Sequence, residues 1–349
     1  MTYIPLQLIN GFFLLSDWVF FPKFSHIEVK QPVFIIGNPR TGSTHLMRVL
    51  AKDKKNFAVP KMWELILAPS ITQRKIVRAL GRLDQRFGNP LSHWILEWEA
   101  RAFREGRKYR RVRFEEPDED ELSLLTIFSA IHLVFAFPFL EAFRPMVFFD
   151  QEFSPAEKNR FITYYQRCMQ RTLYIYGIEK HILSKSPANS GRVGALSETF
   201  PDARFIYLTR TPLEVYPSLM SLFSFNCSLF ADPLEPYPFG EELLEITKHW
   251  YSYPFARLEQ NPNNYQILRY EDLVQDLERS VREIFTSLGL EIDPAYAQSL
   301  QTAVAKSEDY NSRHDYSLAE MGYTPEQIIA EYRDAFERFG FETSVLKTG

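Results

Sequence analysis

Short apolar runs alternate with helical periodicities along this chain of 349 residues. Five of these runs predict buried strands, at residues 33–37, 146–150, 181–185, 204–210 and 265–271. Apolar residues at helical spacing separate most of them, for example over residues 156–175, 188–199 and 241–259. Strands that alternate with helices predict a parallel sheet with helices on both faces. We therefore expect an α/β fold of three layers around a central five-stranded parallel sheet.

The same pattern predicts one large domain over residues 31–340, with a short tail at residues 341–349. A helical insertion, about residues 62–145, separates the first two predicted strands, and a helical tail follows the last one. The apolar N-terminal segment, residues 1–30, lacks the basic start of a signal peptide. A membrane-spanning helix there would have to bury Asn10 and Asp17. This segment therefore either packs on the domain or, through residues 1–24, touches a membrane surface or lines an apolar entrance.

Composition narrows the functional class. The net charge of −4 gives no electrostatic support for binding nucleic acid. The two cysteines, Cys168 and Cys227, are far apart, which argues against a disulfide framework and fits a reducing compartment. No metal-binding motif is present, so we expect no metal. The expected location is cytoplasmic, with membrane association as the alternative.

A basic run over residues 101–113 is followed by an acidic run over residues 115–121. The simplest interpretation is a solvated helix, a turn at Pro117 and a second helix whose first turn favours acidic residues. The alternative is contact with an anionic membrane or partner.

Candidate chemistry begins after the first predicted strand, in "VFIIGNPRTGSTHLMRVL" (residues 33–50). Its glycines have the spacing of the phosphate-binding loop G-x-x-x-x-G-K-[ST], but serine replaces the lysine. Backbone N–H groups, hydroxyls and the positive end of the following helix predict a phosphate or sulfate site. The site residues expected here are Arg40, Thr41, Gly42, Ser43, Thr44 and His45. Without the lysine that a kinase needs, the loop favours a different anion and no obligatory Mg²⁺.

Two more cations end predicted strands, Lys185 and Arg210. Thr211 and Pro212 are suited to begin a helix after Arg210, and Pro217 predicts a kink or a late helix start near Ser218. Alternatively, Arg210 pairs with Glu214 and Ser218 is an ordinary surface hydroxyl. Because carboxyl ends of parallel strands share one sheet edge, these groups predict a ligand with several separated negative charges.

These segments resemble the sulfotransferase superfamily, and its bacterial branch most of all. "NPRTGSTH" is similar to the family's loop for the 5′-phosphosulfate of its donor, 3′-phosphoadenosine-5′-phosphosulfate (PAPS). "RTPLEVYPS", with Arg210 and Ser218, is similar to its 3′-phosphate motif, and Lys185 matches a lysine that faces the sulfuryl group. The resemblance implies PAPS as donor, 3′-phosphoadenosine 5′-phosphate (PAP) as product, and Arg40 and Lys185 as catalytic cations. This donor has no β,γ-diphosphate, so the missing lysine is not needed.

The chain also departs from the family. Pro187 stands where many cytosolic members have a basic histidine after the lysine. We expect Glu64 to be the general base instead, although it could simply pair with Lys61. The other candidate bases are His132, His93 and Asp150. The family's glycine-rich C-terminal motif is absent, which leaves Arg313 and His314 as further candidates for binding the 3′-phosphate.

The acceptor is predicted from aromatic residues, which make up 15% of the chain. Residues 128–140 and 221–239 are rich in phenylalanine and either line an apolar pocket or form ordinary core. We expect a small hydroxylated acceptor, hydrophobic or lipid-like. Alternatives are a carbohydrate acceptor, a small-molecule kinase with the same fold, and a nucleotide-binding module without catalysis.

Overall fold

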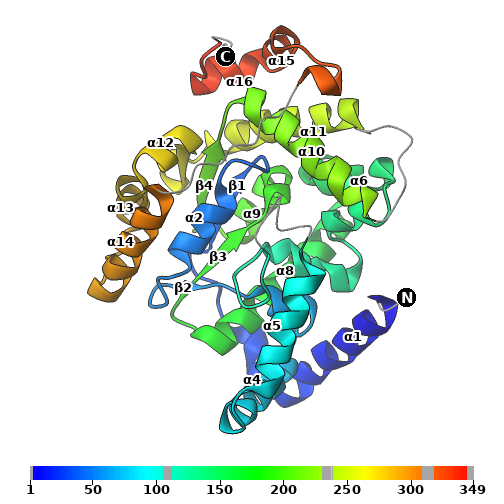
Figure 1. Ribbon diagram of the computed structural model, residues 1–349, viewed down its shortest axis with the longest axis vertical. Coiled ribbons are helices and arrows are strands. Elements are labelled where there is room, and N and C mark those ends of the chain that lie inside the picture. The colour runs from blue at the N-terminus through cyan, green and yellow to red at the C-terminus, as the bar shows by residue number, and fades with distance from the viewer. Residues whose placement is uncertain (1–2, 105–111, 230–236, 238, 309–317, 344–349) are drawn as a thin grey trace.

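The computed structural model describes residues 3–104, 112–229, 237, 239–308 and 318–343 (Figure 1). Its strands are β1 (Val33–Gly37), β2 (Phe57–Ala58), β3 (His181–Lys185), β4 (Arg204–Thr209) and β5 (Tyr265–Arg269). The helices before β3 are α1 (Tyr3–Phe20), η1 (Pro22–His26), α2 (Ser43–Leu50), α3 (Met62–Ile66), α4 (Ile71–Arg86), α5 (Pro90–Ala102), η3 (Asp120–Ile127), η4 (Ile131–Phe135), α6 (Leu140–Val147), α7 (Phe149–Glu152) and α8 (Pro155–Tyr176). The helices after β3 are η5 (Pro187–Arg192), α9 (Val193–Thr199), α10 (Pro212–Ser228), α11 (Gly240–Leu258), η6 (Pro262–Asn264), α12 (Tyr270–Gln275), α13 (Leu277–Leu288), α14 (Pro294–Glu308), η7 (Ala319–Met321), α15 (Pro325–Glu331) and α16 (Arg333–Phe339).

The five strands form one sheet in the order β2-β3-β1-β4-β5, and every neighbouring pair is parallel. β1 lies in the middle, between β3 and β4. The predicted three-layer α/β fold with a five-stranded parallel sheet is therefore confirmed. This order brings the ends of β1, β3 and β4 together at one edge of the sheet.

Side-chain alternation along β1 explains the two helical layers. Phe34 and Ile36 are buried on one face, in a core that includes residues of α8, α9, α11 and α16. Val33 and Ile35 are buried on the other face, in a second core shared with α2, α13 and α14. Because both faces of the sheet are covered, β1 reads as a continuous apolar run rather than an alternating one.

One predicted strand is wrong. Residues 146–150 span the end of α6 and the start of α7, and the fifth strand is instead the two-residue β2. The reason lies in the helical spacing of Leu140, Phe143 and Val147, which are all buried on one side of α6. A five-residue apolar run can belong to a buried helix as well as to a strand.

The other predicted elements lie close to their expected places. β4 and β5 end at Thr209 and Arg269, slightly earlier than predicted. The three helical patterns correspond to α8, to η5 with α9, and to α11. Most described residues between β2 and β3 are helical, as expected for the insertion, although residues 112–119 form turns and extended backbone before η3.

The N-terminal helix α1 packs on the domain, as one of the two interpretations proposed. Its buried residues are Gln7, Asn10, Leu14 and Asp17, three of them polar. Asp17 accepts hydrogen bonds from the backbone N–H groups of Ile71 and Thr72, so it caps the start of α4. In the part of the chain that the structure describes, no helix has the length and apolar character that crossing a bilayer requires.

Candidate functional site

The loop after β1 has the backbone that its glycines predict. Gly37 has a φ of 124°, and a Cβ there would lie 2.1 Å from the carbonyl oxygen of Leu208 on β4. Gly42 has a φ of 79° and immediately precedes α2, where a Cβ would lie 2.9 Å from the ring of Tyr270. Only glycine fits these two positions without a shift of the neighbouring strand or ring. The loop is therefore held tightly at both ends.

Polar contacts within this loop fix its centre. Thr41 is fully buried, and its hydroxyl donates a hydrogen bond to the carbonyl oxygen of Asn38 over 2.9 Å. Ser43 is also buried, and Thr44 is half-buried at the first turn of α2. His45 lies on the exposed side of α2, where its Nε2 is 3.3 Å from the hydroxyl of Ser307 on α14. The structure therefore places His45 against α14, whereas Thr41 to Thr44 form the loop and the helix start.

Arg40 joins this loop to α10. Its Nε–H donates a hydrogen bond to the hydroxyl of Ser218 over 2.8 Å. Arg210, at the end of β4, donates from Nη1 to the backbone carbonyl of Arg40 over 3.0 Å. Ser218 is buried, with 4% of its surface exposed. Arg40 thus meets two residues that lie 170 and 178 positions further along the chain, at the ends of β1 and β4.

The surroundings of Arg210 combine both interpretations from the sequence. Its guanidinium forms the expected ion pair with Glu214 and also lies 4.0 Å from the centre of the Tyr270 ring. Among the described residues, its buried Nε and the buried hydroxyl of Thr211 have no hydrogen-bond partner. Buried donors without a protein partner are expected where a ligand binds. These two groups at the sheet edge therefore fit an anion such as a phosphate.

Helix α10 begins at Pro212, as the pair Thr211 and Pro212 predicted. It continues through Pro217, so the late start, one of the two alternatives offered for that proline, is wrong. The side chain of Thr211 makes no capping hydrogen bond. The first turns of α10 nevertheless bring Ser218 to Arg40, because both helix and loop leave neighbouring strands.

Lys185 ends β3 and is almost fully buried, with 4% of its side chain exposed. Its Nζ lies 2.5 Å from Oε1 of Glu119, and the other carboxylate oxygen of Glu119 lies 3.4 Å from Nε2 of His132. Glu119 therefore connects a buried lysine at the sheet edge to a histidine on η4. His132 keeps 22% of its side chain exposed, whereas Nδ1, the ring nitrogen that does not face Glu119, is buried.

A helix, η3, begins within the acidic run and carries Asp120 and Glu121 in its first turn, as the simplest interpretation of the sequence expects. The burial of these acidic residues was not expected. Asp118, Glu119, Asp120 and Glu121 are all buried. Glu121 forms a bidentate pair with the fully buried Arg192, at 2.5 and 3.0 Å. A buried carboxylate needs such a partner because burial removes its hydration. The signal that the sequence analysis missed is the pair of cations Lys185 and Arg192, which need carboxylates once they are buried.

Asp120 occupies a different environment. Its carboxylate accepts hydrogen bonds from the hydroxyls of Tyr165, over 2.5 Å, and Ser184, over 3.1 Å. Burial raises the pKa of Asp120 to about 7. The negative charge of Glu121 also raises this pKa, whereas the two hydrogen bonds lower it. Burial and the nearby Asp120 in turn raise the pKa of Tyr165, which keeps the phenol protonated. Asp120 therefore belongs to a polar network beneath the site.

Glu64 is completely buried at the start of α3. Its carboxylate accepts hydrogen bonds from the backbone N–H of Lys61, the guanidinium of Arg78 and the hydroxyl of Tyr176. The expected pairing of Lys61 with Glu64 through side chains is absent, since the ammonium of Lys61 instead pairs with Glu115. These contacts fix Glu64 as the cap of its own helix.

The remaining candidate bases, Asp150 and His93, lie on α7 and α5. Asp150 accepts hydrogen bonds from the backbone N–H groups at the start of α9 and from Tyr253, which gives it a capping role. His93 is exposed on α5. Arg313 and His314 lie outside the described residues.

Aromatic side chains from the two predicted acceptor segments meet beside His132. The ring of Phe135 on η4 lies 5.4 Å from that of Phe223 on α10, which lies 5.7 Å from that of Phe239. His132 itself makes an edge contact with Phe135 at 6.2 Å. Segments that are far apart in the sequence thus form one apolar cluster next to the histidine.

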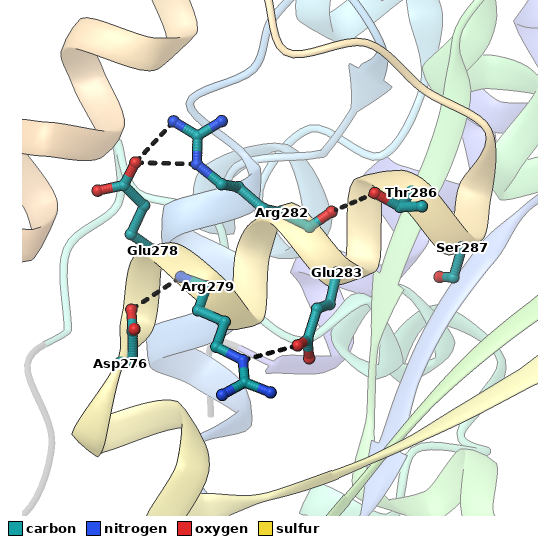
Figure 2. A pocket seen from close by; sticks show the side chains of 7 residues that line it. All are labelled: Asp276, Glu278, Arg279, Arg282, Glu283, Thr286 and Ser287. Carbon is teal, nitrogen blue, oxygen red and sulfur yellow. Dashed lines mark hydrogen bonds and ion pairs between the residues drawn. The ribbon is translucent and has the colours of Figure 1, made fainter.

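A hollow of about 570 Å³ on α13 is not part of this site. Figure 2 shows that its lining comes from one stretch, Asp276 to Ser287, which is α13 with the residue before it, and that ion pairs run along the helix surface. Arg279 pairs with Glu283 and Arg282 with Glu278, each four residues apart. Such paired charges on an exposed helix need no ligand.

Known proteins resemble this chain over most of its length. Two curated relatives are omega-hydroxy-beta-dihydromenaquinone-9 sulfotransferases Stf3, from Mycobacterium bovis and Mycobacterium tuberculosis. Each is 26% identical over 98% of this chain and 84% of the relative. The crystal structure of sulfotransferase STF9 from Mycobacterium avium has a TM-score of 0.73 at 20% identity, covering 95% of this chain and 82% of that one. Sulfotransferase STF1 from Mycobacterium tuberculosis has a TM-score of 0.65 at 19% identity, covering 94% and 83%.

The family assignment follows from the match over the main body of the chain. The profile of the sulfotransferase family matches residues 32–294, which include all five strands, the loop after β1 and the start of α10. This chain therefore belongs to the sulfotransferase family.

Proposed function

We propose that this sulfotransferase transfers a sulfuryl group from PAPS to a hydroxyl group of a hydrophobic, lipid-like acceptor. The observation that carries the proposal is the meeting of Arg40, Arg210 and Ser218 at the sheet edge, with Lys185 at the end of the adjacent strand. This arrangement suits a donor with phosphate groups at both ends of an adenosine.

Each phosphate has a matching set of residues. The 3′-phosphate fits Arg210 and Ser218, where the Nε of Arg210 and the hydroxyl of Thr211 are buried without a partner among the described residues. The 5′-phosphosulfate fits the loop from Arg40 to Thr44, with backbone N–H groups at the start of α2. Lys185 would stabilise the negative charge that develops on the leaving phosphate oxygen.

For the general base, the contacts favour His132 over Glu64. The carboxylate of Glu64 is fully buried and holds its own helix start together with Arg78 and Tyr176. His132 is partly exposed, and Glu119 lies between it and Lys185. It would thus supply an imidazole near the lysine, although Pro187 occupies the family's histidine position.

The proposed reaction follows from these roles. The acceptor oxygen forms a bond to sulfur while the bond from sulfur to the phosphate oxygen breaks. The hydroxyl proton passes to His132, and the electron pair of the broken bond remains on the phosphate of PAP. Glu119 acts as a positioning residue, since it holds His132 and Lys185 from opposite oxygens of one carboxylate.

The lipid-like acceptor is supported by two observations. The aromatic cluster of Phe135, Phe223 and Phe239 lies beside His132. The curated relatives are named for a hydroxylated dihydromenaquinone acceptor. A polar sugar would gain little from such an apolar cluster.

The test is a transfer assay with PAPS labelled in its sulfuryl group. Hydroxylated long-chain lipids and a panel of mono- and oligosaccharides are offered separately to the full chain. We expect label on the lipids and none on the sugars. Transfer to sugars alone would contradict the lipid-like acceptor, and no transfer to either, together with intact PAP binding, would favour a module without catalysis.

A further inference from the structure

Helix α1 buries polar residues and exposes apolar ones, which is the reverse of the usual pattern of a surface helix. Its polar residues Asn10 and Asp17 are buried against α4 and α8, where they bind backbone groups and Arg171. Its outward residues are apolar, and six of them are Leu8, Phe12, Leu15, Trp18, Val19 and Phe20. Each of these six is at least 45% exposed. A contiguous apolar surface of this kind marks an interaction site.

The apolar surface continues onto the α4–α5 hairpin. α1 packs against α4, which packs against α5, and the three helices lie together at one end of the molecule (Figure 1). The exposed apolar residues of the hairpin include Leu80, Leu83, Phe87, Trp94 and Trp98. Exposed tryptophans are typical of proteins that sit at the headgroup level of a membrane.

Positive charge accompanies this apolar surface. The charged residues of α4 that reach the surface are basic: Lys75, Arg78, Arg82 and Arg86. Three of them line a shallow hollow of about 410 Å³ together with Tyr174 and Ile175. The ammonium of Lys75 also lies 4.6 Å from the ring of Phe21, just after α1. Cations and apolar groups therefore occupy the same region of the surface.

We propose that α1 and the α4–α5 hairpin form a docking surface for a membrane that contains anionic lipids. Apolar side chains with adjacent lysines and arginines match a bilayer interface with negative headgroups. A second copy of the chain fits less well, because a symmetric pairing would bring the cations of the two copies close together.

The surface is also close to the proposed reaction site. The hydroxyl of Tyr3, at the start of α1, donates to the carbonyl oxygen of Leu125 on η3 over 2.6 Å. η3 follows directly after Glu119, which contacts Lys185. Docking would therefore place the aromatic cluster near the bilayer that holds a lipid-like acceptor. Access to a lipid-like acceptor rests on the proposed function, whereas docking to a membrane needs neither donor nor acceptor.

The test is co-sedimentation of the full chain with vesicles of phosphatidylcholine, with and without phosphatidylglycerol. We expect binding to the anionic vesicles that weakens in high salt. The double variant Leu8→Gln and Leu15→Gln, at positions that are each 70% exposed, should lower binding about tenfold or more. The matched control, Leu229→Gln with Val274→Gln, replaces exposed apolar residues elsewhere and should bind as the parent does.

A second variant keeps the test decisive if the first one folds poorly. Lys75→Gln with Arg82→Gln should remove most of the salt-dependent part of binding while leaving the apolar face intact. Equal vesicle binding by parent and both double variants would overturn the inference. So would light scattering that shows a concentration-dependent dimer without vesicle binding.

Turnover separates this inference from the proposed function. The Leu8 and Leu15 variant should keep transfer to a hydroxylated acceptor dispersed in detergent while losing transfer to the same acceptor in vesicles. Vesicle binding without any sulfuryl transfer would leave docking intact and contradict the function. Transfer in detergent without vesicle binding would support the proposed function and contradict the docking surface.

Discussion

Two buried glutamates, Glu64 at the start of α3 and Glu119 at the start of η3, show how similar burial can serve different ends. Each pairs with a cation, Arg78 for Glu64 and Lys185 for Glu119. Glu64 directs its other contacts to its own helix start and to Tyr176. Glu119 instead contacts His132 on η4 through its second carboxylate oxygen. The two carboxylates therefore differ in what they join: Glu119 links a lysine at the sheet edge to a histidine, whereas Glu64 holds a helix start.

The largest expected effect separates these two glutamates directly. His132→Ala should lower turnover about 10²–10⁴-fold by removing the proposed base. Glu119→Gln should also lower turnover and should change the turnover–pH profile, because it alters the surroundings of the imidazole. Steady-state kinetics over a range of pH measures both effects.

Glu64→Gln is the matched control for that experiment. It should lower the melting temperature, since it weakens the contacts with Arg78 and Tyr176, while the folded protein keeps its turnover. A collapse of turnover in Glu64→Gln with normal turnover in His132→Ala would restore Glu64 as the base and reverse the comparison.

A second effect is on stability, and it compares a buried with an exposed glutamate of the acidic run. Glu121→Gln should lower the free energy of unfolding by about 3–5 kcal/mol, because it leaves the buried charge of Arg192 uncompensated. Glu115→Gln, at an exposed ion pair with Lys61, should cost less than about 1 kcal/mol. Urea unfolding followed by circular dichroism measures both, and equal costs would show that the run is solvated after all.

The sequence predicted the sheet edge well and this acidic run poorly, for physical reasons. β1 is a continuous apolar run and β4 contains four consecutive apolar or aromatic residues, which is typical of strands buried on both faces. β2 has only two residues, too few for any pattern, and residues 146–150 were ambiguous between helix and strand. Four acidic residues in a row suggest solvent unless their cations are known, and here Lys185 and Arg192 come from a distant part of the chain.

The contacts within the donor site were predictable only in part. The shared carboxyl edge of parallel strands and the motif spacing predicted that Arg40, Arg210 and Ser218 lie together, and the hydrogen bonds among them agree with that prediction. The polar inward face of α1 was not predictable, because it depends on the start of α4, which Asp17 caps. Long-range capping of this kind leaves no local periodicity.

A smaller effect should appear in the pH dependence of stability. The pKa of Asp120 is about 7 in the folded protein, against 3.8 as its ordinary value. Between these values the folded state keeps a proton that the unfolded state has released, so stability falls as pH rises from about 4 to about 7. The slope contributed is at most about 1.4 kcal/mol per pH unit. Asp120→Asn should flatten it in unfolding experiments, whereas an unchanged slope would assign the dependence to another group.

The most direct test of the account is calorimetric titration with PAP, because every later step depends on the proposed binding of a bisphosphorylated adenosine by Arg40 and Arg210. The parent chain should bind PAP, and Arg210→Ala should weaken binding about 10–100-fold through loss of a charge-assisted contact. Arg282→Ala, on the exposed helix of Figure 2, removes the same charge away from the site and should leave the affinity unchanged. Equal affinity of the parent and Arg210→Ala for PAP would contradict the account.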